Sequence, residues 1–153
     1  MHEAVHRKSK VVYAVKRVPR RDLHPSDAVA LHDEIATFQM VTDCDHIVKL
    51  YDVYDETDFT YLVLECMRGG DLIDRIIEKR HYTEYDAKEV SRKLILGVEH
   101  CHKKRIANRN LKPENLLLVS SHYNFDDILR KAYRLNIFSS KNKACGKRHG
   151  CED

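Results

Sequence analysis

Hydrophobic and polar residues alternate over residues 11–18, a period of two that is typical of a half-buried β-strand. The alternation places four side chains on one face, namely Val12, Ala14, Lys16 and Val18. Lys16 is therefore the single charged residue on an otherwise apolar face. A lysine in such a position either extends its amine to solvent or needs a negatively charged partner.

A helix is predicted to follow this strand. Pro25 suits the first helical turn, and apolar residues then recur with helical spacing at Leu31, Ile35 and Phe38. Glu34 lies on or beside that apolar stripe. Because a helix packed on a strand brings the two faces together, we expect Lys16 and Glu34 to form an ion pair. Exposure of both side chains to solvent is the alternative.

Two further strands are predicted over residues 47–54 and 61–65, joined by a polar turn at residues 55–58. Together with the first strand they would form a small antiparallel sheet. Gly69 and Gly70 interrupt the pattern directly afterwards, which marks either a boundary between two lobes or an ordinary loop from strand to helix.

The pattern then becomes helical. A short helix is predicted over residues 71–77, and Thr83 with Asp86 resembles a capping box at the start of a long helix. The long helix carries one apolar face, formed by Ala87, Val90, Leu94, Ile95, Val98 and Cys101. A second amphipathic helix is predicted between Phe125 and Tyr133, whereas residues 136–153 show no sustained period and are expected to be a loop or a disordered tail.

Composition places the chain among soluble globular proteins. Its 153 residues are 42% hydrophobic and 33% charged, which is enough to bury one core. No run of about 18 apolar residues and no apolar signal core are present, so neither a membrane span nor secretion is expected. We expect a cytoplasmic protein, with the nucleus as the alternative.

The cysteines and the basic residues suggest little specific chemistry. Five irregularly spaced cysteines favour reduced thiols over a disulfide framework. Cys145, His149 and Cys151 lack the paired spacing of a zinc site. The net charge is +3, and basic residues gather towards the C-terminus. Such a cluster is usually a solvated tail, so a nucleic-acid partner is not expected.

Residues 107–115 read Ala-Asn-Arg-Asn-Leu-Lys-Pro-Glu-Asn. This segment resembles the catalytic loop of eukaryotic serine/threonine protein kinases, His-Arg-Asp-Leu-Lys-Pro-Glu-Asn. It matches at Arg109 and at residues 111–115, and it departs at Asn108 and Asn110. Asn110 replaces the aspartate that accepts the proton of the substrate hydroxyl, and an amide is a far weaker base than a carboxylate. The alternative for Asn110 is a residue that caps a turn.

Two other segments carry the same resemblance. Tyr-Ala-Val-Lys at residues 13–16 is similar to the Val-Ala-Ile-Lys strand of kinases, and Glu34 falls where that family has its helical glutamate. Gly-Gly-Asp-Leu-Ile-Asp-Arg-Ile at residues 69–76 is similar to the calcium/calmodulin-dependent kinase group. The resemblance implies an α+β, partial protein kinase fold, with a small antiparallel-sheet lobe containing one helix and a mainly helical second lobe.

The resemblance also implies a nucleotide site. Lys16, paired with Glu34, would hold the α and β phosphates of ATP, and Leu64 would guard the back of the adenine pocket. Lys112 would neutralise the transferred phosphate, and Asn115 would hold Mg²⁺. The resemblance also places Glu65 and Met67 of the hinge at the nucleotide. The remaining residues that it implies there are Ala14, Asp71 and Leu117. For Asp71, the N-cap of a helix is an equally compatible role.

Several parts of a kinase are missing from the sequence. The five glycines include no G-x-G-x-x-G loop before Lys16, and residues 2–6 resemble what remains of the strand that follows such a loop. Neither Asp-Phe-Gly nor Ala-Pro-Glu is present, and the segment 128–134, where we expect the former, holds no acidic residue for magnesium. We therefore expect a truncated kinase and regard both ATP and Mg²⁺ as uncertain ligands of this chain.

The predicted organisation has four parts. Residues 2–64 form a partial small lobe, 65–69 a hinge, 70–119 a partial large lobe and 120–153 an unassigned basic tail. By descent the function is that of a serine/threonine protein kinase domain, with weak or absent activity expected in this chain. Three functions remain open: a working serine/threonine kinase, a pseudokinase-type module that binds ATP or a protein partner, and a non-functional fragment.

Overall fold

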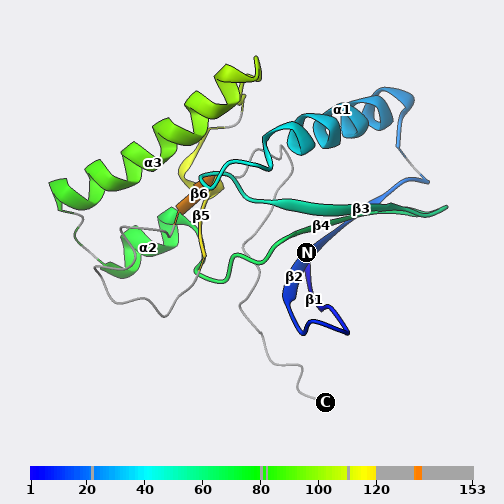
Figure 1. The fold of residues 1–153 in the computed structure, drawn as a ribbon, viewed down its shortest axis with the longest axis horizontal. Helices are drawn as coiled ribbons and strands as arrows, with labels where there is room; N and C mark the ends of the chain where they lie inside the picture. The colour runs from blue at the N-terminus through cyan, green and yellow to red at the C-terminus, as the bar shows by residue number, and fades with distance from the viewer. Residues whose placement is uncertain (22, 80, 82, 110, 120–132, 136–153) are drawn as a thin grey trace.

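The computed structural model describes residues 1–21, 23–79, 81, 83–109, 111–119 and 133–135. A four-stranded antiparallel sheet forms the N-terminal part of the fold (Figure 1). Its strand order is β1 (His2–Val5), β2 (Val12–Pro19), β4 (Phe59–Glu65) and β3 (Leu50–Asp55). The strand predicted over residues 47–54 thus begins later, at Leu50. The predicted small antiparallel sheet is confirmed.

Helix α1 (Pro25–Val41) links β2 to β3 and lies along one face of this sheet (Figure 1). Pro25 occupies the start of the helix, where its missing N–H leaves no hydrogen bond unmade. Phe38 and Val41 of α1 are fully buried against Leu62 and Leu64 of β4 in one apolar cluster. Burial of a phenylalanine of this kind contributes roughly 2–3 kcal/mol, so this face of the helix fixes its position on the sheet.

The second part of the fold is mainly helical. It contains α2 (Leu72–Lys79) and α3 (Glu84–Lys103), a 3-10 turn at Pro113–Asn115, and the strands β5 (Leu116–Leu118) and β6 (Tyr133–Leu135). Leu72, Val90, Leu116 and Leu118 form a smaller apolar cluster. The predicted α+β architecture, a small sheet with one helix followed by a helical part, is confirmed. None of the helices within the described ranges is long and apolar enough to cross a membrane.

The start of α3 matches its sequence signal. The Thr83 backbone N–H donates to the Asp86 carboxylate at 3.0 Å, and the Asp86 backbone N–H donates to the Thr83 hydroxyl at 3.1 Å. Both bonds satisfy N–H groups that a helix leaves unpaired at its first turn. The predicted capping box is therefore confirmed.

The predicted apolar face of α3 is only partly correct. Val90 and Cys101 are buried, but Ile95 is 64% exposed and Ala87 is also exposed. Leu94 and Val98 are partly buried and pack against the smaller apolar cluster, and the buried residues of α3 also include Asp86, Lys93 and Gly97. Four of the six predicted residues therefore face inward, and Ala87 and Ile95 do not.

The segment after Val119 also departs from prediction. Tyr133–Leu135 forms β6 and pairs antiparallel with β5, with Leu116 opposite Leu135. The amphipathic helix predicted between Phe125 and Tyr133 is therefore wrong at Tyr133, and its other residues lie outside the described part of the chain. Residues 136–153, predicted to be a tail, lie outside it as well.

Candidate nucleotide site

Strand β2 carries two residues of the candidate site, Ala14 and Lys16. Ala14 lies directly opposite Leu64 of β4, and Lys16 lies opposite Leu62. Ala14 and Lys16 point to the same side of the sheet because they are two residues apart. Lys16 is only 9% exposed, so its amine is held inside the apolar face rather than extended into solvent.

Lys16 interacts with the predicted partner on α1. Burial lowers the pKa of Lys16 below its usual value of 10.5, and the negative charge of Glu34 opposes that fall. Glu34 is half-buried on α1, the helix that covers the sheet. This electrostatic effect is in the direction expected if the helix packs on this strand with Glu34 near Lys16. A cation held in this way can attract a second anion, such as a phosphate.

An apolar surface adjoins Lys16. Ala14, Leu64, Met67 and Leu117 belong to one buried cluster, and each of the four is less than 7% exposed. They come from β2, β4, the segment after β4, and β5. The structure therefore brings together four of the residues that resemblance assigns to the nucleotide, although the first and the last of them are more than 100 residues apart in sequence. Glu65 ends β4 next to them, opposite Tyr13.

The hinge is fixed to β5 by backbone hydrogen bonds. The N–H groups of Arg68 and Gly69 donate to the carbonyls of Val119 and Leu118 at 3.1 and 2.9 Å, and the Leu118 N–H donates to the Gly70 carbonyl at 3.0 Å. Gly70 has φ of +82°, a conformation that favours glycine. The chain thus turns from the sheet directly into the second part of the fold.

Asp71 stands at the end of this turn, bridged to Leu117. One of its carboxylate oxygens accepts the backbone N–H of Asp74 at 2.9 Å, which caps the first turn of α2. The N-cap role left open by the sequence is thus present. The bridge to Leu117 also places Asp71 beside the buried cluster, so the two roles are compatible.

The loop that resembles a kinase catalytic loop lies between α3 and β5. Lys112 is exposed and its carbonyl accepts the Asn115 N–H at 2.9 Å, which closes the 3-10 turn. Asn115 is buried, with 4% of its surface exposed. Asn110, the predicted replacement of the catalytic base, lies outside the described residues.

The described residues do not fit a magnesium site. No group of three or more histidine, cysteine or acidic side chains is arranged to hold a metal ion in that part of the chain. Asn115 supplies a neutral amide oxygen, and Mg²⁺ in proteins is normally bound by carboxylates together with phosphate and water. The case for ATP rests on a buried cation, Lys16, that lies beside a buried apolar cluster.

Comparison with known proteins identifies the family. The protein kinase domain profile matches residues 1–130. The chain belongs to the protein kinase family. It is 40% identical over 116 residues to calcium/calmodulin-dependent protein kinase type 1 of Caenorhabditis elegans, which covers 76% of this chain and 32% of that protein. A probable myosin light chain kinase of Dictyostelium discoideum is 34% identical over 117 residues, covering 76% of this chain and 30% of that protein.

The kinase chain spans about a third of the length of the curated relatives that it matches. The resemblance to serine/threonine kinases near the calcium/calmodulin-dependent group is confirmed. Kinases of this family generally use ATP and Mg²⁺.

Two long-range contacts were not predicted. Arg68 in the hinge donates to both carboxylate oxygens of Glu3 in β1, at 3.0 and 3.2 Å. Asp43, just after α1, binds His100 and Lys104 of α3. Both contacts join residues more than 50 positions apart, so no local sequence pattern predicts them. The opposite charges of the pairs were visible, but opposite charges are common in a chain that is one-third charged.

Proposed function

We propose that this chain is the nucleotide-binding portion of a serine/threonine protein kinase domain, that it holds ATP, and that it transfers phosphate weakly or not at all. The carrying observation is the buried amine of Lys16, which interacts with Glu34 and adjoins an apolar cluster. In this proposal residues 2–64 are the small lobe, 65–69 the hinge and 70–119 the partial large lobe.

The proposed division of labour follows from the positions of the residues. Lys16 binds phosphate oxygens through its cation, and Glu34 keeps that amine charged and oriented. Ala14, Leu64, Met67 and Leu117 exclude water around the base. The hinge backbone from Glu65 to Met67 supplies the polar groups for adenine, as the family resemblance implies. When bound, ATP would supply the phosphoryl group.

Catalysis is proposed to be impaired at two points. Asn110 replaces the general base, and the sequence contains no Asp-Phe-Gly to hold a metal ion. Lys112 is exposed and available to a transferred phosphate. Because more than one catalytic group is missing, Asn110→Asp alone should not restore phosphoryl transfer to a serine or threonine peptide. Transfer by the unsubstituted chain that exceeds that of Lys16→Ala would show that the kinase is active.

A thermal unfolding experiment tests nucleotide binding. The purified chain is heated with and without ATP, once with Mg²⁺ and once with a chelator, beside Lys16→Ala and Arg17→Ala. Arg17 is the matched control, because it follows Lys16 in β2 but is exposed and lies over the Phe59 ring. A ligand at 100 times its Kd stabilises the folded state by about 2.7 kcal/mol.

We expect ATP to raise the midpoint for the unsubstituted chain and for Arg17→Ala, but not for Lys16→Ala. A rise that persists in the chelator would fit a site without magnesium. No rise for the unsubstituted chain at millimolar ATP would reject the proposal. The cytoplasm remains the proposed location, and a fluorescent fusion that accumulates in the nucleus would reject that part.

A further inference from the structure

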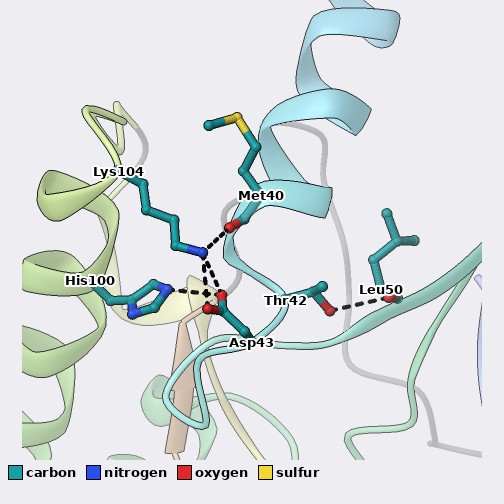
Figure 2. Close-up of polar contacts among 6 residues, drawn as sticks. All are labelled: Met40, Thr42, Asp43, Leu50, His100 and Lys104. Atoms are coloured by element: carbon teal, nitrogen blue, oxygen red, sulfur yellow. Dashed lines mark hydrogen bonds and ion pairs between the residues drawn. The ribbon is translucent and has the colours of Figure 1, made fainter.

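Asp43, His100 and Lys104 form a polar cluster between the ends of two helices (Figure 2). The Lys104 amine donates to both carboxylate oxygens of Asp43, at 2.8 and 2.9 Å, and to the backbone carbonyl of Met40 at 2.6 Å. The Nε2 atom of His100 lies 3.0 Å from the Asp43 carboxylate. These contacts connect the C-terminal end of α1 with that of α3.

The cluster supplies something that α1 lacks. A helix leaves its last carbonyls unpaired and carries partial negative charge at its C-terminus, where a basic side chain is favourable. The last turn of α1 contains no basic residue. Lys104, which lies 64 positions beyond Met40, provides both the hydrogen-bond donor and the positive charge.

The basic residues of this polar cluster are partly buried. The side chains of His100 and Lys104 are 25% and 31% exposed, whereas that of Asp43 is 60% exposed. Hydrogen bonds from Lys104, and then from His100, lower the pKa of the Asp43 carboxyl below its usual value. Lys104 is itself the C-cap of α3, and its backbone N–H donates to the Cys101 carbonyl at 3.0 Å. The backbone of Lys104, from which its side chain extends, is therefore held in place by the end of α3.

The polar cluster is one end of a longer contact along α3. Gly97, His100, Cys101 and Lys104 recur at helical spacing, so they share one face. A β-carbon at Gly97 would lie 3.3 Å from the His46 carbonyl oxygen, so the two backbones are nearly in contact there. Cys101 and Cys44 are both buried in the larger apolar cluster. This face of α3 thus packs along the segment that follows α1.

We infer that Lys104 and Asp43 are positioning residues for Lys16, because they fix the end of α1 to α3 and so hold Glu34 at its place beside β2. Glu34 and Met40 belong to the same helix and are six residues apart, which is about 9 Å along the axis. A rigid helix transmits a displacement of its last turn to Glu34. The consequence for ATP affinity rests on the proposed function, whereas the consequence for Lys16 does not.

The direct test measures the Lys16 amine without nucleotide. The rate at which Lys16 reacts with an acylating reagent is followed by mass spectrometry from pH 7 to 11, and the midpoint of the profile gives its pKa. The plateau reports access of the reagent separately. Lys104→Met removes the charge and donors while keeping an unbranched side chain. Lys103→Met is the matched control, since Lys103 lies on the same helix and pairs locally, with Glu99 at 2.7 Å.

If Glu34 moves away, its charge no longer opposes the effect of burial, and the pKa of Lys16 falls further. A fall of half a pKa unit raises labelling about threefold at a fixed pH below the midpoint. We expect such a fall in Lys104→Met, none in Lys103→Met and a return towards the unsubstituted value in Lys104→Arg. An unchanged midpoint in a folded Lys104→Met would overturn the inference and leave Lys104 a purely stabilising role.

Two additions keep the outcomes distinct. If Lys104→Met does not fold, Asp43→Asn is used, because it keeps the side-chain size at an exposed position and removes only the charge. ATP affinity is then measured by fluorescence titration, with a threefold or greater loss expected in the same variants. If the unsubstituted chain binds no ATP, the proposed function fails, and the Lys16 profile alone decides the positioning role.

Discussion

Arg105 occupies a backbone conformation that suits glycine, which leads to a specific stability prediction. It has φ of 60° and directly follows Lys104, the C-cap of α3. Its N–H donates to the His102 carbonyl, and the next N–H, that of Ile106, donates to the Cys101 carbonyl, both at 2.9 Å. Helices often end in this way with a left-handed residue, and glycine adopts it without a clash of the β-carbon.

Replacing Arg105 with glycine should therefore stabilise the fold. The left-handed conformation costs an ordinary residue about 1–2 kcal/mol. Glycine avoids this cost, but it lowers the free energy of unfolding by about 0.4–1 kcal/mol because the unfolded chain gains conformational freedom. The net gain is about 0.5–1 kcal/mol, which corresponds to a rise of roughly 1–4 °C in Tm for a chain of this size. Little is lost with the side chain, because Arg105 is exposed.

The assay is thermal unfolding followed by circular dichroism, with Arg105→Ala as the control. Alanine removes the same charge and length but keeps the β-carbon, so it should not stabilise. Lys10, with φ of 59° in the turn between β1 and β2, offers an independent repeat as Lys10→Gly. If Arg105→Gly is no more stable than Arg105→Ala, the assumption that backbone strain exists at this position is refuted.

Three other predictions concern the core and the site. Burial lowers the pKa of Lys16 below 10.5, so the unfolded chain holds this proton more tightly. The free energy of unfolding of the unsubstituted chain, minus that of Lys16→Met, should therefore rise as pH increases from the folded pKa towards 10.5. Urea denaturation at several pH values measures this difference, and a difference that does not change with pH would contradict the prediction. Gly97→Val should lower the free energy of unfolding by about 1–3 kcal/mol, because it forces α3 away from the His46 carbonyl, and Gly97→Ala should lower it less. Equal urea midpoints for Gly97→Val and the unsubstituted chain would exclude the close approach. Thr83→Ala should cost about 1 kcal/mol in the same assay through loss of the capping bond to the Asp86 N–H, and no change would mean that the cap does not limit stability.

Local patterns predicted those parts of the kinase fold that depend on neighbours in sequence. The period of two in β2 placed Lys16 on the buried face, and the capping box located the start of α3 within a residue. Glu34 was predicted beside Lys16 because both lie on apolar faces that must pack together. In each case the physical cause, burial of one face or pairing of terminal N–H groups, acts over a few residues and leaves a visible pattern.

Other features depend on partners that the sequence does not place. Ile95 was predicted to be buried and Lys93 was not, but Lys93 is 4% exposed and Ile95 is 64% exposed. The close approach at Gly97 and the buried Asp86 at the N-terminal end show which face α3 turns inward, and this face is set by the segments it packs against. Strand β6 was missed because three residues give too short a pattern, and its pairing with β5 becomes visible only in three dimensions.

The strand order of the sheet constrains how a growing chain can fold. Strand β2 lies between β1 and β4, and its last residue, Pro19, pairs with Phe59, forty positions later. While the chain is being synthesised, β2 leaves the ribosome well before β4, its second partner in the described sheet, and the hairpin of β1 and β2 is at best marginally stable. Helix α1 likewise has no complete sheet to cover until Glu65 has emerged. The small lobe should therefore form in one late step, and until then its apolar face, including the residues around Lys16, is open to chaperones and to aggregation.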